Sequence, residues 1–229
     1  MQKIIYKSGK KDFDIFSANF LRDTIQKLLI EKLGIISIAL SGGSTPIPIL
    51  NILKNENIDW NRVSFYIVDE RCVSLEDSQC NYNNINIVFF SNISSNSYSI
   101  ITDGVSFKKS SENYQYLLNE NLAKTPNGVP EFDLILLGMG EDGHTASLFP
   151  NTEALEEQDN FVVLNDVPQL ATQRITLTYP VILAAKCAIV LCKGEKKEEI
   201  VENIYTNKGN SYPINKIAKE HSNIKWLIG

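Results

Sequence analysis

A short apolar run followed at once by three glycines constrains this chain more than any other feature. The run from Leu134 to Leu137 is too short for a helix of its own and is bounded by glycine, so it predicts a strand buried on both faces. Gly138, Gly140 and Gly143 follow, and there the backbone can turn sharply and approach a ligand without a Cβ atom in the way. Glycines at the carboxyl end of a buried strand are typical of the ligand site of an open α/β sheet.

Polar side chains crowd the next residues, where the sequence predicts that a helix begins. They are Asp142, His144, Thr145 and Ser147. The imidazole of His144 is a candidate general base, although a single histidine at the start of a helix is more often a capping or packing residue. The three glycines also satisfy G-x-G-x-x-G, the dinucleotide-binding fingerprint, and Asp166 after the next predicted strand is a candidate ribose ligand. A dinucleotide site therefore stays open as an alternative.

A second glycine-rich segment lies between a predicted strand and a predicted helix. It consists of Ser41, Gly42, Gly43, Ser44 and Thr45, with Pro46 placed in the first turn of the helix. Exposed backbone N–H groups, hydroxyl donors and the positive end of a helix dipole suit a phosphate group. An ordinary strand-to-helix turn with a Ser/Thr cap explains these residues equally well. The segment is not a Walker A loop, because no Gly-Lys-Ser/Thr follows it.

A charged triplet, Asp69-Glu70-Arg71, comes directly after a third predicted strand. The carboxyl ends of parallel strands meet at one edge of a sheet, so these side chains are expected near the two glycine-rich segments. A solvated loop is the alternative interpretation.

Helix and strand alternate along the chain without repeats or a long linker. Strands are predicted over 3–6, 35–40, 63–68, 134–137, 161–164, 174–178, 187–192 and 224–228, and helices over 13–33, 46–53, 81–90, 110–122, 179–185, 195–205 and 213–220. The polar stretch 91–99 is predicted to be a surface loop. This pattern predicts a single α/β domain over 1–229, with three layers and a mainly parallel sheet.

Composition excludes several classes of function. A net charge of -5 without a Lys/Arg cluster argues against nucleic acid as a partner. No apolar run suits a signal peptide or a membrane span, so we expect a cytoplasmic protein without membrane contact. The chain has two histidines and four cysteines, with neither C-x-x-C nor H-E-x-x-H, so we expect no metal and no cofactor. A magnesium site made of carboxylates alone stays open, but no Asp/Glu spacing favours one.

Taken together, these motifs resemble the 6-phosphogluconolactonase family, which belongs to a wider group with glucosamine-6-phosphate deaminase. The resemblance covers nearly the whole chain, through SGGSTP at 41–46, VDER at 68–71, GMGEDGHTASLFPNT at 138–152, QRITLTYPVI at 173–182 and KGEKK at 193–197. The related deaminases carry a glutamate where this chain has Phe149, which favours the lactonase. The resemblance implies a Rossmann-like open sheet similar to that of the deaminase group.

The resemblance implies hydrolysis of 6-phospho-D-glucono-1,5-lactone to 6-phospho-D-gluconate, in the oxidative pentose phosphate pathway. A lactone is an activated ester, so its hydrolysis needs a base for water, donors for the oxyanion and an anchor for the phosphate. We expect His144 to be the base and Asp142 to orient it, although two residues apart they need not touch. We expect Arg71 to stabilise charge at the lactone or to bind hydroxyls, and Asp69 to order the site.

The same resemblance suggests which residues hold the phosphate. The segment 41–45, Arg174 and Lys197 are similar to the phosphate-contacting positions of the family, with Lys196 as the alternative to Lys197.

Two other functions of the same structural group stay open. One is a sugar-phosphate deaminase or isomerase, which would release ammonia from glucosamine 6-phosphate. The other is a non-enzymatic domain that senses sugar phosphates, normally attached to a DNA-binding segment. We expect no such segment here, because the first predicted helix begins about ten residues from the N-terminus.

Overall fold

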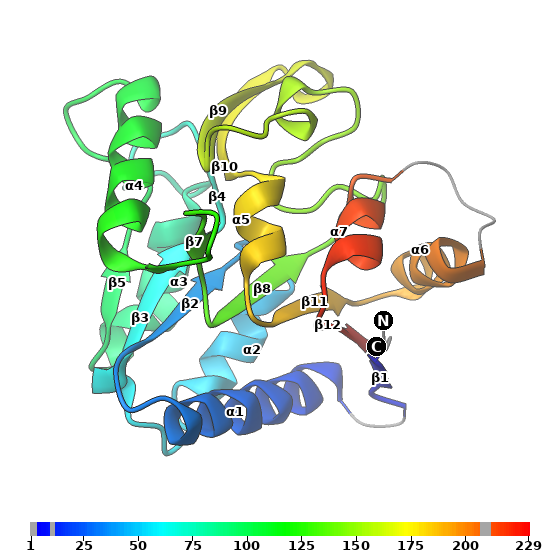
Figure 1. Ribbon diagram of the computed structural model, residues 1–229. Coiled ribbons are helices and arrows are strands. Elements are labelled where there is room, and N and C mark those ends of the chain that lie inside the picture. The colour runs from blue at the N-terminus through cyan, green and yellow to red at the C-terminus, as the bar shows by residue number, and fades with distance from the viewer. Residues whose placement is uncertain (1–3, 10–11, 207–211) are drawn as a thin grey trace.

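The computed structural model describes residues 4–9, 12–206 and 212–229, and its centre is a seven-stranded parallel sheet (Figure 1). The strand order is β1-β12-β11-β8-β2-β3-β5, and every neighbouring pair is parallel. The strands are β1 (Ile4–Lys7), β2 (Ile36–Leu40), β3 (Val63–Ile67), β5 (Asn96–Tyr98), β8 (Leu134–Gly138), β11 (Ala188–Cys192) and β12 (Ile224–Ile228). The predicted mainly parallel α/β sheet is confirmed.

Helices cover both faces of this sheet. Figure 1 shows α1 (Phe13–Glu31) and α2 (Pro46–Leu53) along one face, and α5 (Tyr179–Ala184) and α7 (Ile214–Glu220) along the other. Every residue of β2, β3 and β11 is buried, which explains why these strands read as continuous apolar runs rather than as alternating patterns. The remaining helices are α3 (Asn81–Val88), α4 (Phe107–Asn121) and α6 (Glu195–Thr206).

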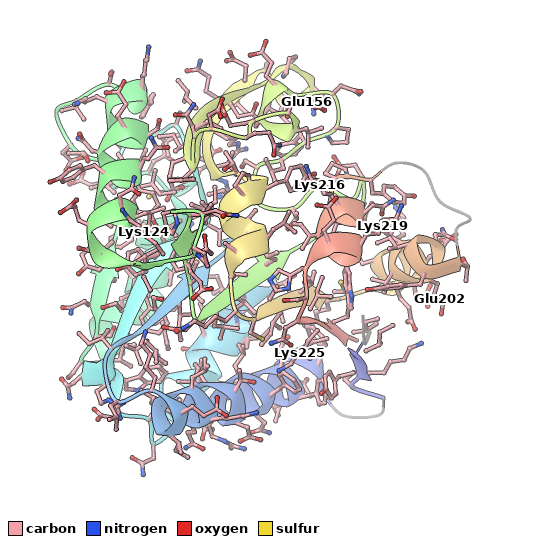
Figure 2. The ribbon with its side chains drawn as sticks, viewed as in Figure 1. Lys124, Glu156, Glu202, Lys216, Lys219 and Lys225 are labelled. Carbon is pink, nitrogen blue, oxygen red and sulfur yellow. The ribbon has the colours of Figure 1, made fainter. Side chains whose placement is uncertain are left out.

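The contact between α5 and α7 combines a hydrogen bond with a cation–π interaction. The Tyr179 hydroxyl donates to the Pro213 carbonyl oxygen at 2.7 Å. The ammonium group of Lys216, which is labelled in Figure 2, lies 4.7 Å from the centroid of the Tyr179 ring. Burial raises the pKa of Tyr179 above its ordinary value, so its hydroxyl remains a donor at neutral pH.

A second, antiparallel sheet was not expected from the sequence. It has the order β4-β10-β9, with β4 (Asp69–Arg71), β9 (Val162–Val167) and β10 (Thr172–Leu177), and Figure 1 shows β9 and β10 above the parallel sheet. The charged triplet is therefore a strand and not a solvated loop. Its register with β10 places Arg71 opposite Arg174 and Asp69 opposite Thr176.

The helix expected to begin within 142–147 is absent, and this prediction is wrong. The segment forms a turn with an isolated bridge between Thr145 and Leu148, and the next helical turn is a single 3-10 turn, Glu153–Leu155. Ala146 and Asn151 have positive φ angles, of 51° and 62°, which no right-handed helix contains. A glycine-rich start followed by no helix also removes the pyrophosphate site that the dinucleotide alternative needs.

Every other predicted helix is present, with its ends shifted by at most three residues. Part of the predicted surface loop 91–99 is the edge strand β5, whose polar side chains are only partly covered. The short strands β6 (Ala123–Lys124) and β7 (Pro130–Glu131) pair with each other. The first predicted strand is present from Ile4, while Lys3 lies outside the described residues. Over the described part of the chain, no helix has the length and apolar character to span a membrane.

The polar sequence around His221 suggests a solvated position. The structure instead places His221 at the C-cap of α7, where it is buried. It is 1% exposed, and its Nδ1 accepts a hydrogen bond from the backbone N–H of Asn223 at 3.1 Å. Burial lowers the pKa of His221 because the charged imidazolium is disfavoured away from water.

Candidate active site

A pocket opens at the carboxyl ends of β2, β3, β8 and β11, four strands that are neighbours in the sheet. It is lined by Ser41, Gly42, Gly43, Ser44, Thr45, Pro46, Asp69, Arg71, Asn81, Gly138, Met139, Gly140, His144, Thr145, Ala146 and Lys197. The two glycine-rich segments, the charged triplet and the start of α6 thus meet at one place, as the open-sheet rule leads one to expect.

The segment 41–45 forms one wall of the pocket. The backbone N–H of Ser41 donates to the Leu136 carbonyl oxygen at 2.9 Å, which continues the pairing of β2 with β8 beyond the strand end. Thr45 is the N-cap of α2 but its side chain makes no capping hydrogen bond, and the buried hydroxyl of Ser41 has no partner among the described residues. A simple Ser/Thr cap therefore does not explain this segment, and the Ser41 hydroxyl is available to a ligand.

Gly140 and His144 belong to a tight turn that aims the imidazole. The backbone N–H of Gly140 donates to the His144 carbonyl oxygen at 2.8 Å, and a Cβ at residue 140 would lie 2.3 Å from the imidazole ring. Only glycine allows the ring to fold back onto the backbone in this way. Gly140 therefore serves the placement of a side chain.

Asp142 and His144 do touch, although their spacing alone left this undecided. The Nδ1 atom of His144 lies 2.5 Å from Oδ1 of Asp142, and the same oxygen accepts the backbone N–H of His144 at 3.1 Å. Burial would raise the pKa of Asp142, but these hydrogen bonds outweigh burial and hold that pKa below its ordinary value. An ionised Asp142 fixes the proton on Nδ1, so Nε2 is the nitrogen that can accept a proton.

Phe149 covers one face of the imidazole. The ring centroids of Phe149 and His144 are 4.0 Å apart with an interplanar angle of 26°, and Phe149 itself is buried. The stack and the carboxylate together restrict both rotation and tilt of the imidazole. Asp142 does not line the pocket and acts on it only through His144.

Two hydroxyl groups hold the backbone between His144 and Phe149. Thr145 donates to the Gly138 carbonyl oxygen at 2.7 Å, and Ser147 donates to Oδ2 of Asp69 at 2.6 Å. Between them Ala146 keeps its left-handed conformation, which costs roughly 1–2 kcal/mol for a residue with a Cβ atom. The Ser147 bond joins the imidazole turn to the start of β4, so Asp69 has a structural tie as well as a place in the pocket.

Arg71 and Arg174 form a pair of like charges across the β4–β10 ladder. No carboxylate of the described residues forms an ion pair with either guanidinium group. Burial, and next the charge of Arg71, lower the pKa of Arg174, and its Nε is buried without a hydrogen-bond partner. Like charges directly opposite each other destabilise a sheet, so this pair favours a bound anion. Arg71 lines the pocket, whereas Arg174 is not among its lining residues.

The two lysines at the start of α6 point to different places. Lys197 lines the pocket, whereas Lys196 forms an ion pair with Glu141 at 2.9 Å, with its side chain 74% exposed. Of the two candidates for a phosphate contact, Lys197 is the one whose location fits.

Sequence reasoning missed several lining residues, of which Asn81 is the most informative. It is the first residue of α3, is 3% exposed, and donates from Nδ2 to the Asp69 carbonyl oxygen at 2.8 Å. No motif marks it, because its partners are distant in the sequence. Within the described ranges, no group of three or more His, Cys, Asp or Glu side chains is arranged to hold a metal ion.

Fold and site together define an open α/β protein with a pocket at the carboxyl ends of its strands, lined by the cations Arg71 and Lys197. A sequence model of glucosamine-6-phosphate isomerases/6-phosphogluconolactonase matches residues 16–226. The 6-phosphogluconolactonase of Chlamydia pneumoniae is 36% identical over 240 residues, covering 98% of this chain and 86% of that protein. The chain belongs to the glucosamine-6-phosphate isomerase/6-phosphogluconolactonase family.

Solved structures agree with this membership. The crystal structure of 6-phosphogluconolactonase from Thermotoga maritima matches with a TM-score of 0.86 and 29% identity, with 100% of both chains covered. A monomeric glucosamine-6-phosphate deaminase matches with a TM-score of 0.76 and 21% identity, covering 100% of this chain and 97% of that one, which shows a shared fold. The resemblance and the fold expected from the motifs are thereby confirmed.

Proposed function

We propose that this protein is a 6-phosphogluconolactonase, which hydrolyses 6-phospho-D-glucono-1,5-lactone to 6-phospho-D-gluconate in the pentose phosphate pathway. It is an enzyme of the lactone-hydrolase type. One observation carries the proposal, namely that an imidazole held by a carboxylate and a glycine-rich segment with an unpaired hydroxyl, that of Ser41, line one pocket. Full-length similarity to a 6-phosphogluconolactonase supports the substrate.

His144 is the general base of the proposed mechanism. Nε2 accepts a proton from water as the water oxygen attacks the lactone carbonyl carbon, and the ionised Asp142 stabilises the imidazolium that forms. The bond between the carbonyl carbon and the ring oxygen then breaks, and the proton on Nε2 passes to that oxygen. The product acid ionises, so each turnover releases one proton to the solvent.

Positive charge in the pocket serves the phosphate of the substrate and the oxyanion that develops during hydrolysis. Arg71, beside Asp69 at the end of β4, stabilises the oxyanion of the tetrahedral intermediate or binds sugar hydroxyls. The segment 41–45 and Lys197 hold the phosphate, because backbone donors at a helix start and an ammonium group suit a phosphate. Arg174, opposite Arg71 in the β4–β10 ladder, adds positive charge and contributes to phosphate binding.

The deaminase alternative is disfavoured by Phe149. Where the related deaminases carry a glutamate, this chain stacks an apolar ring on His144, and Asp142 is the carboxylate that the described residues offer to the imidazole. A single base activating water suits the opening of a lactone. Among the described residues, the site has no second carboxylate that contacts His144 beside Asp142.

Product analysis tests the proposal. The purified protein is added to freshly generated 6-phosphogluconolactone while acid release is followed, and separately to glucosamine 6-phosphate while ammonia is measured. We expect acid release well above the spontaneous rate and no ammonia. Ammonia release without lactone hydrolysis would instead identify a deaminase.

We also propose that residues 1–229 act as one domain in the cytoplasm, without a nucleic-acid partner. The acidic composition and the alternation of helices and strands support this proposal. A single cooperative unfolding transition and no binding of NAD(P) or DNA are the expected results.

A further inference from the structure

Glu70 is the member of the charged triplet that does not line the pocket. Its side chain is fully buried, between two neighbours that both line the pocket. Oε1 accepts the backbone N–H groups of Arg71 at 2.8 Å and Asn81 at 2.7 Å. Oε2 accepts the backbone N–H of Tyr82 at 2.9 Å and the thiol of Cys80 at 3.4 Å. Four donors thus converge on one carboxylate.

These donors lie on both sides of the segment 72–79, which leaves β4 and leads to α3. The carboxylate of Glu70 therefore closes the base of this segment, and it also satisfies the free N–H groups in the first turn of α3. Arg71 adds a second tie, because its Nη1 donates to the Gln79 carbonyl oxygen at 2.7 Å. Burial raises the pKa of Glu70, and the backbone hydrogen bonds oppose that rise. Because both carboxylate oxygens face only donors, the group is ionised.

Asn81 connects the residues held by Glu70 to the opposite wall of the pocket, because it contacts both Asp69 and Gly42. Its amide nitrogen holds the Asp69 carbonyl oxygen, while its amide oxygen rests against Gly42, where a Cβ atom would lie 2.0 Å away. That oxygen is buried and has no hydrogen-bond partner among the described residues. The position of Asn81 therefore sets how closely the segment 41–45 approaches Asp69 at the start of β4.

We propose that Glu70 is a positioning residue of the sugar-phosphate site, because its carboxylate fixes Asn81 and Arg71 and thereby the gap between segment 41–45 and β4. The inference rests on the proposed function for the identity of the ligand. It differs from a purely structural role in predicting that Glu70 governs ligand affinity in the folded protein.

Glu70→Gln is the sharpest perturbation, since it keeps the size of the side chain. A glutamine offers one acceptor oxygen, and its amide group would face at least one backbone N–H that needs an acceptor. The matched control is Asp133→Asn. Asp133 is a second buried carboxylate, at the amino end of β8, which accepts from Ser37 N at 2.9 Å, Lys32 at 2.7 Å and Lys186 at 2.9 Å.

Both variants are expected to lose stability, so kinetics and ligand binding are measured at a temperature where circular dichroism shows both to be folded. For Glu70→Gln we expect KM for the lactone to rise at least about tenfold. We expect the stabilisation of the protein by 6-phospho-D-gluconate in thermal unfolding to weaken in parallel. Asp133→Asn should keep both properties near the wild-type values. A Glu70→Gln protein that is destabilised but binds and turns over like Asp133→Asn would overturn the inference.

Two further measurements keep the test decisive. If Glu70→Gln does not fold, Asn81→Ala removes the link to segment 41–45 and should raise KM in the same way, and an unchanged KM would overturn the inference. If the wild type does not hydrolyse the lactone, the proposed function fails, whereas protection by 6-phospho-D-gluconate or inorganic phosphate still decides whether Glu70 positions an anion site.

Discussion

Replacing Lys197 by alanine, with Lys196→Ala as its neighbour control, separates a pocket cation from a surface cation on one helix turn. Lys197 lines the pocket, and Lys196 pairs with Glu141 outside it. Removing a charge-assisted contact to phosphate costs roughly 1.5–3 kcal/mol, which is roughly a 10- to 150-fold loss. A surface ion pair such as that of Lys196 contributes about 0–1 kcal/mol, so its loss should leave the kinetics almost unchanged.

The assay compares 6-phosphogluconolactone with unphosphorylated glucono-1,5-lactone for the wild type and both variants. For Lys197→Ala the loss should appear in KM for the phosphorylated lactone, and also in kcat if phosphate anchoring positions the carbonyl group. The unphosphorylated lactone, already a poor substrate, should hardly respond, because the missing contact is one that it never makes.

Two results would refute this reasoning. Equal losses with both lactones would show that Lys197 supports the fold or the chemistry rather than the phosphate. A loss for Lys196→Ala as large as that for Lys197→Ala would show that the pocket is not the place where the phosphate binds.

Two further predictions concern metal dependence and pH. Lactone hydrolysis should survive exhaustive EDTA treatment, because the proposed chemistry needs only a base and donors; activity lost to EDTA and restored by Mg²⁺ or Zn²⁺ would contradict this. The lowered pKa of buried His221 means that the unfolded chain binds the proton more readily, so the unfolding free energy should fall as pH drops below about 6.5. Urea unfolding at pH 7.5 and 5.5 should show a smaller fall for His221→Asn, and an unchanged fall would refute the assignment.

The sequence predicted the parallel sheet because strands buried on both faces appear as short apolar runs between glycines and polar turns. It also predicted that residues 41–45, Asp69, Arg71 and His144 would meet, since each follows a strand and the carboxyl ends of parallel strands share an edge. These inferences need only local pattern and topology.

The antiparallel sheet and the residues that support the site could not be read in the same way. Pairing of β4 with β10 joins segments about a hundred residues apart. The charged residues Asp69 and Arg71 do not have the apolar pattern by which a strand is predicted from sequence. The prediction of a helix beginning within 142–147 was wrong because Thr145 and Ser147 bond to other elements and hold Ala146 at a positive φ. Contacts of this kind, like that of Asn81 with Gly42, depend on three-dimensional proximity and leave no periodic signal.

Replacing His144 removes the group on which the proposed mechanism depends. Its loss also removes the stack with Phe149 and the bond to Asp142, so we expect a decrease in stability of about 1–2 kcal/mol. For a chain of this size that is a fall in Tm of roughly 2–8 °C, which leaves the protein folded at the assay temperature.

The most direct test of the account is therefore kcat for acid release from 6-phosphogluconolactone, measured side by side for the wild type and for folded His144→Ala. The wild type should hydrolyse the lactone well above the spontaneous rate. His144→Ala should lose roughly 10²–10⁴-fold in kcat with KM within a few-fold, as expected when a positioned general base is removed. A folded His144→Ala protein with near-normal kcat would contradict the account and make Asp69 the next candidate for the base.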